Sequence, residues 1–172
     1  MNSNQRTDGY GGSIGDRARF LLEVADATIK AIGKDKSGIC LCLLAYSTIC
    51  RYTMRWKTIT RNLAQLLKAS RLVYIHLVDH SSMDAPIVPA LMKATFRRVF
   101  KGKLILSGGY DAARAESDLA AGKCNLIAVG RPFLAIPDLI PRWKAGATLN
   151  EIDFNTCYML GAKGYTNYPV LS

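Results

Sequence analysis

The sequence predicts an α/β fold, a partial (β/α) barrel of the TIM type with about four parallel strands that alternate with helices. Two observations support this fold class. Short apolar runs alternate with stretches of helical periodicity along the 172-residue chain. Glycine-containing phrases follow the last two apolar runs, where barrel enzymes bind a cofactor phosphate. A complete barrel typically needs about 250 residues, so one domain over residues 1–172 is expected to supply part of a barrel.

The helices are predicted from apolar residues that recur at spacings of three and four. The first runs from Asp16 to Ile32, with a capping-box pattern that begins at Ser13 and a stop at Gly33. Four further helices are expected at residues 58–70, 86–99, 111–121 and 137–145.

The strands are predicted from short apolar runs that lie between these helices. They occupy residues 38–44, 72–78, 103–106 and 125–129. Strands separated by helices form parallel sheets with right-handed crossovers. The two outer strands would present unpaired backbone groups, so the chain is expected to bind a partner there. The expected partner is a second copy of the chain or a complementing N-terminal half, and a chain without either is expected to aggregate.

The charge distribution argues against a nucleic-acid partner. The net charge is +10, from 23 basic and 13 acidic residues. Much of the excess lies between Asp35 and Asp79, a segment without any acidic residue. This segment lacks the spacing of a helix-turn-helix, a zinc finger or an aromatic RNA-binding motif.

Composition indicates a core-forming protein of a reducing compartment. Hydrophobic residues make up 49% of the chain, and none of its five cysteines forms a C-x-x-C pair. The polar N-terminus lacks the apolar stretch of a secretory signal, and the apolar run at residues 38–50 is too short to span a bilayer. We therefore expect a cytoplasmic protein with no membrane segment.

Two glycine phrases form the candidate cofactor site. Ser107, Gly108 and Gly109 close the third strand, and Gly130 and Arg131 close the fourth. Glycines let backbone N–H groups approach an anion, and an arginine adds a bidentate positive charge. For a single glycine motif, a plain strand-to-helix turn is the stronger interpretation. A second glycine motif follows one β/α unit later, and this repetition favours a phosphate site.

Other assignments of the polar side chains remain open. Arg131 has the alternatives of capping a helix or pairing with Asp138. His76 and His80 would point the same way from a strand, towards the barrel mouth, but a packed histidine is the simpler interpretation. Cys40 and Cys42 would share one strand face, where buried, inert thiols are favoured over a metal or redox site. No metal site and no catalytic residue is assigned.

Five phrases occur in an order that is typical of one enzyme family. They are Arg6–Ile14, Asp16–Phe20, Leu104–Asp111, Val129–Phe133 and Gly164–Pro169. In this order they resemble the Old Yellow Enzyme family, NADH:flavin oxidoreductases that act as ene-reductases. The resemblance covers residues 5–39 and 58–172 and corresponds to the C-terminal half of such an enzyme.

The resemblance implies a cofactor, a reaction and a set of binding residues. FMN would lie at the barrel mouth, take hydride from NADPH or NADH and pass it to an alkene conjugated to a carbonyl. The phosphate phrases map to the residues of the candidate cofactor site, and Tyr165 maps to a position that borders the flavin pocket. The family's substrate-binding histidine pair, or histidine and asparagine, and its proton-donating tyrosine lie upstream of the matched half.

Departures from the family pattern predict an impaired enzyme. Members of the family usually have the sequence Gly-Ile-Arg-Leu-Ser-Pro at the position where this chain has Gly38–Leu43. The arginine replaced by Cys40 faces the flavin pyrimidine in the family and stabilises the reduced anion. Residues 42–57 no longer resemble the family, and a locally shifted reading frame would explain their composition. The favoured function is a truncated FMN-binding oxidoreductase acting on enone-type small molecules; the alternative is an inactive remnant or binding module.

Overall fold

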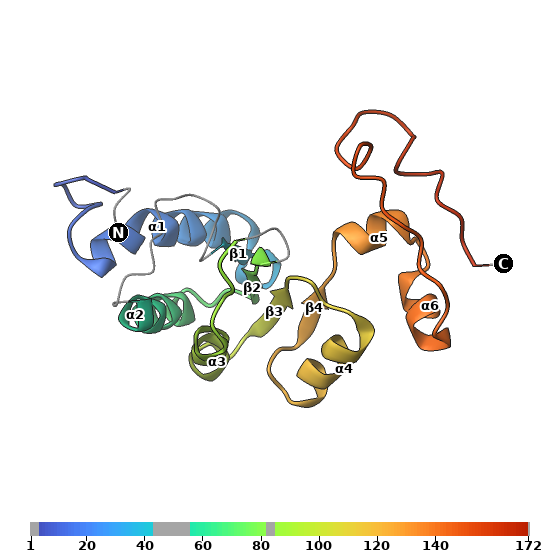
Figure 1. The fold of residues 1–172 in the computed structure, drawn as a ribbon. Helices are drawn as coiled ribbons and strands as arrows, with labels where there is room; N and C mark the ends of the chain where they lie inside the picture. Colours follow the sequence, from blue (N-terminus) through green and yellow to red (C-terminus); the bar gives the residue numbers. More distant parts are fainter. Residues whose placement is uncertain (1–3, 43–55, 82–84, 172) are drawn as a thin grey trace. The chain divides into compact units, whose positions relative to one another are not determined.

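A computed structural model describes residues 4–42, 56–81 and 85–171, apart from the side chain of Trp56 (Figure 1). The described chain divides into two compact units, Met1–Ile127 and Ala128–Ser172. The expectation of one domain over residues 1–172 stays a prediction.

The elements follow the alternation that the sequence predicts (Figure 1). In chain order they are α1 (Ile14–Ile32), the 3-10 helix η1 (Lys34–Lys36), β1 (Gly38–Cys42), α2 (Trp56–Ala69), β2 (Tyr74–Val78), α3 (Ala90–Val99), β3 (Lys103–Ser107), α4 (Ala112–Ala120), β4 (Leu126–Ala128), α5 (Arg131–Ala135) and α6 (Leu139–Ala145).

The four strands form one sheet in the order β1-β2-β3-β4. β1 pairs with β2, and β2 with β3, in parallel; Cys40 lies opposite His76, and His76 opposite Ile105. The predicted partial barrel of parallel strands and alternating helices is therefore confirmed. Residues 43 and 44 of the first predicted strand, and most of the segment that departs from the family, lie outside the described residues.

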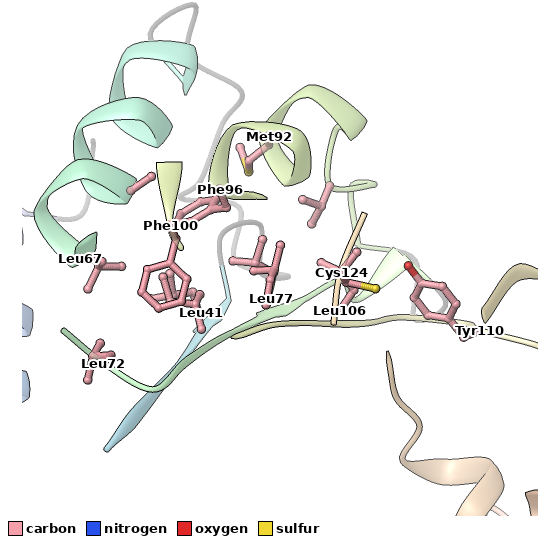
Figure 2. Packing of buried hydrophobic residues seen from close by; sticks show 14 of the residues in the cluster. Leu41, Leu67, Leu72, Leu77, Met92, Phe96, Phe100, Leu106, Tyr110 and Cys124 are labelled. Atoms are coloured by element: carbon pink, nitrogen blue, oxygen red, sulfur yellow. The ribbon is translucent and has the colours of Figure 1, made fainter. Parts of the chain in front are cut away.

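One face of the sheet carries the core of the first unit. Alternate strand residues on this face are almost completely buried, including Ile75, Leu77 and Leu106. Leu67 from α2 and Phe96 from α3 belong to the same cluster, and Figure 2 shows them close to the strand leucines. The side chains between the buried strand residues point to the opposite face and are exposed or only partly buried.

Local signals set the helix ends. Ser13 caps α1, because its Oγ accepts a hydrogen bond from the Asp16 N–H at 3.2 Å. Gly33 ends this helix with φ 93°, a left-handed value that favours glycine. Among the described residues, no helix has the length and apolar character needed to cross a bilayer.

Two helix predictions needed correction. α3 begins at Ala90, four residues after the predicted start at Pro86, because Pro89 adopts an extended ψ of 139° before the first turn. A proline also disfavours helical geometry in the residue that precedes it. The short helix α5 was not predicted, since Arg131 and Pro132 were assigned to a strand-closing phrase. Proline close to a helix start fits the observed helix.

Candidate functional site

The turn after β3 has a backbone that only glycine adopts easily. Gly108 has φ 114° and Gly109 has φ 59°, both in the left-handed region. A Cβ on Gly108 would lie 2.4 Å from the carbonyl oxygen of Asp79 and 2.7 Å from its Cβ. Gly108 is therefore required by its conformation and by its close approach to the end of β2.

Arg114 donates hydrogen bonds to the carbonyl oxygens of this turn. Its Nη1 donates to the oxygen of Gly108 at 3.0 Å and to that of Gly109 at 3.3 Å. The guanidinium carbon lies 4.1 Å from the centre of the Tyr110 ring. Asp111 caps α4 by accepting from the N–H of Arg114 at 2.8 Å. The first turn of α4 thus fixes the glycine turn, a role that sequence reasoning missed because it depends on where the side chain folds back.

A buried ion pair lies beneath the glycine turn. Asp79 is only 4% exposed, and its Oδ2 is 2.7 Å from Nζ of Lys93 on α3. Its Oδ1 accepts from the N–H of Ser81 at 3.0 Å. Burial alone would raise the pKa of Asp79, but the bonds from Lys93 and Ser81 outweigh it and leave this pKa below its ordinary value. Asp79 is therefore ionised at neutral pH.

Three polar side chains form a row across β1, β2 and β3. Sγ of Cys40 lies 3.8 Å from Nδ1 of His76, and Nε2 of His76 lies 3.0 Å from Oγ of Ser107. Burial lowers the pKa of His76, so its imidazole is neutral at pH 7. Sequence reasoning singled out each of these residues separately, and parallel strand register brings them together.

The second unit holds Gly130 and Arg131. Gly130 precedes α5, and a Cβ built on it would have no heavy atom within 4 Å, so the space beside it is open. The guanidinium carbon of Arg131 lies 6.0 Å from the centre of the exposed Phe154 ring. Asp138, the alternative partner suggested for Arg131, accepts from Nε of Arg142 at 2.8 Å.

Tyr165 belongs to the same unit and is held by its hydroxyl. This group donates to the carbonyl oxygen of Cys157 at 3.0 Å, while 40% of the residue stays exposed. The preceding Gly164 has φ 84° and contacts Thr156 so closely that an added Cβ would lie 2.3 Å from its Oγ1. The loop backbone therefore fixes the position of Tyr165 within its unit.

The predicted site residues thus fall into two groups. Ser107, Gly108 and Gly109 form one turn of the first unit, and Gly130, Arg131 and Tyr165 belong to the second. Their joint action on one cofactor stays a prediction.

Comparisons with known proteins agree with the fold and with the sequence phrases. The model of the NADH:flavin oxidoreductase / NADH oxidase family matches residues 1–150. 12-Oxophytodienoate reductase 1 of Oryza sativa subsp. japonica is 35% identical over 175 residues, which cover 98% of this chain and 45% of that protein. 12-Oxophytodienoate reductase 2 of Arabidopsis thaliana is also 35% identical, with 98% and 46% covered.

Solved structures give the same result. Morphinone reductase in complex with tetrahydroNAD superposes with a TM-score of 0.87 at 38% identity, over 100% of this chain and 46% of that one. A second morphinone reductase structure has a TM-score of 0.86, also at 38% identity, over 99% and 46%. The chain therefore spans about half the length of the relatives that it matches.

Proposed function

Because this chain belongs to the NADH:flavin oxidoreductase / NADH oxidase family, as the Old Yellow Enzyme resemblance predicted, we propose that it binds FMN. The observation that carries this proposal is the intact turn at Gly108 and Gly109. Its two left-handed residues and the bonds from Arg114 fix a backbone loop of the kind that binds phosphate. The pattern of the sequence and the conformation of the turn thus support the same ligand.

The residues of the chain fit a cofactor phosphate. In the first unit we assign the phosphate to backbone N–H groups of Ser107, Gly108 and Gly109; for Gly130 and the guanidinium of Arg131 in the second unit, the same role is proposed from the family resemblance. A Cβ built on Gly130 would have no heavy atom within 4 Å, so the backbone there is open to approach. Tyr165 is assigned to the border of the flavin ring, since the residue is partly exposed and its hydroxyl is anchored.

The proposed reaction is reduction of an alkene conjugated to a carbonyl, with NADPH or NADH as the reductant. Bound FMN would supply the two-electron carrier between these partners. Morphinone reductase, a structural relative, was solved with tetrahydroNAD, which supports a nicotinamide as the hydride source. Cys40 is expected to slow flavin reduction, because a cysteine lacks the positive charge with which an arginine would stabilise the reduced flavin.

An FMN titration of the purified chain, followed by flavin fluorescence, tests the proposal. Saturable one-to-one binding supports it, and a folded chain that leaves FMN fluorescence unchanged contradicts it. Anaerobic addition of NADPH to the complex then separates an oxidoreductase from an inactive binding module. Bleaching of the visible flavin band supports the oxidoreductase, whereas a constant spectrum supports the module.

Replacing Arg131 by alanine is expected to weaken FMN binding by about 1.5 to 3 kcal/mol, the worth of a hydrogen bond to a charged group. This corresponds to a rise in Kd of about 10- to 150-fold. Lys144→Ala is the matched control, since it removes an exposed positive charge from the last turn of α6 in the same unit. Equal Kd values of the two variants for FMN would show that Arg131 does not belong to the binding site.

We further propose that the sheet pairs with additional strands at β1. A closed barrel of this type has eight strands, and the described residues supply four in an order that leaves β1 at an edge. The strand that completes this edge would come from a second copy of the chain or from a complementing N-terminal half. Size-exclusion chromatography over a range of protein concentrations tests self-association. A single monomeric species at all concentrations would contradict pairing of β1 with a second copy of the chain.

A further inference from the structure

An exposed thiol, an imidazole and a hydroxyl follow one another across the sheet face opposite the core. Parallel register places Cys40 opposite His76, and strand alternation turns both side chains away from the buried leucines. Ser107 ends β3 on the same face, two residues beyond the register partner of His76. A nucleophile, a base and a group that orients the base are thus lined up in that order.

The hydrogen-bonding geometry suits transfer of the thiol proton to the ring. Nδ1 of His76 is 3.8 Å from Sγ of Cys40, within the range of a hydrogen bond to sulfur. For Nδ1 to accept this proton, Nε2 must carry the ring hydrogen and donate it to Oγ of Ser107, 3.0 Å away. Burial keeps the ring neutral at pH 7, so Nδ1 has a lone pair to offer.

We propose that Cys40 is a nucleophilic thiol activated by His76 and that it forms covalent adducts with alkenes conjugated to a carbonyl. Ser107 acts as a positioning residue that selects the ring tautomer. The choice of this ligand class rests on the proposed function, because such alkenes are the substrates assigned to the chain. The reactivity of the thiol rests only on the geometry of the three side chains.

The reaction balances without an oxidant or a reductant. Nδ1 of His76 takes the thiol proton, and the Cys40 sulfur forms a bond to the β-carbon of the alkene. The π electrons of the double bond move to the α-carbon and the carbonyl, giving an enolate. The imidazolium then returns the proton to the α-carbon, which leaves a saturated thioether and a neutral histidine.

Cys42 provides an internal control in the same molecule. It is also exposed and lies on the same strand face, with Val78 instead of a histidine as its register partner. Cys124 and Cys157 are buried, and burial raises the pKa of Cys124, so neither is expected to react. A difference in alkylation rate between Cys40 and Cys42 that disappears in His76→Gln therefore reports on the imidazole.

The test measures alkylation of the full chain by 2-cyclohexen-1-one at pH 7, with quenching at timed intervals. Tryptic cleavage after Lys36 and Arg51 gives one peptide that carries Cys40, Cys42 and Cys50, and fragment ions assign each adduct to one of these three thiols. An ordinary thiol is only a few per cent ionised at pH 7, so activation is expected to make Cys40 react about 10-fold faster than Cys42. Equal rates in the folded wild-type chain would overturn the proposal.

Variants identify the base and its positioning residue. His76→Gln retains an amide that can reach Ser107 but removes the basic nitrogen, so the excess rate at Cys40 should be lost. Ser107→Ala should lower this excess and Ser107→Thr should restore it, because threonine keeps the hydroxyl. Circular dichroism melts establish that each variant is folded when it is alkylated. An undiminished excess in folded His76→Gln would overturn the assignment of the base.

The FMN titration keeps the two proposals separable. Fast alkylation of Cys40 in a chain that does not bind FMN would support the thiol site and contradict the flavin function. FMN binding combined with equal alkylation rates at Cys40 and Cys42 would support the flavin function and contradict the thiol site.

Discussion

Replacing Lys93 by methionine is expected to lower the free energy of unfolding by about 3 to 5 kcal/mol, the cost of leaving a buried charge without its partner. The Asp79 side chain is 2% exposed and that of Lys93 is 16% exposed, so water replaces the lost ammonium poorly. Methionine keeps most of the side-chain volume, and the loss is therefore electrostatic. Equilibrium urea unfolding of the variant and the wild type measures it.

A double variant provides the control for this prediction. Asp79→Asn combined with Lys93→Met removes both charges and keeps an oxygen that can accept from the N–H of Ser81. We expect the double variant to recover most of the stability that Lys93→Met loses. If Lys93→Met alone unfolds at the same urea concentration as the wild type, the ion pair contributes nothing to stability.

The same pair predicts how stability depends on pH. The pKa of Asp79 is lower in the folded chain than the ordinary value of 3.8. Its contribution to stability is therefore fully present well above the unfolded-state pKa, begins to decline at about pH 5, and is lost as the pH falls through the lower folded-state pKa. In the Asp79→Asn, Lys93→Met double variant, this part of the acid dependence should be missing.

Replacing Gly108 by alanine is expected to destabilise the chain by about 3 kcal/mol or more, from backbone strain and a steric clash together. Alanine seldom adopts φ 114°, and its Cβ would lie 2.4 Å from the Asp79 carbonyl oxygen. Both atoms of this contact are held by backbone, so neither moves cheaply. Since the turn is the proposed phosphate-binding loop, the FMN affinity should fall with the stability. Urea unfolding and FMN titration measure the two effects.

Gly122→Ala is the matched control for strain without a clash. Gly122 has φ 65°, and a Cβ on it would have no heavy atom within 4 Å. Its replacement should cost about 1 kcal/mol, the strain of a left-handed alanine alone, and should leave FMN binding unchanged. Equal losses of unfolding free energy in the two variants would show that the clash between the added Cβ at position 108 and Asp79 relaxes without cost.

Much of the fold could be predicted because the signals are local. Apolar spacing gave α1 within two residues at its start, and Ser13 and Gly33 marked its ends. The glycines after β3 predicted a tight turn, which the left-handed values of Gly108 and Gly109 confirm. The prediction was wrong at the start of α3 and missed α5, where prolines set the boundaries and the apolar pattern is short.

The candidate site was predicted less completely. The phrase around Gly108 identified a backbone turn, but Arg114 and the pair formed by Asp79 and Lys93 were not expected. These side chains come from different elements and meet only after the helices pack on the sheet. The assignment of Gly130, Arg131 and Tyr165 to a flavin site stays a prediction.

By itself the sequence determined the class of fold, the membership of a flavin oxidoreductase family and the positions of the glycine turns. These depend on periodicity, on conformational preference and on short phrases, all of which are local properties of the chain. Only the tertiary structure decided which side chains meet. Cys40, His76 and Ser107 are separated by about thirty residues at each step, and parallel strand register alone brings them within hydrogen-bonding reach. Register and packing are set by the whole core, so no local pattern specifies such contacts.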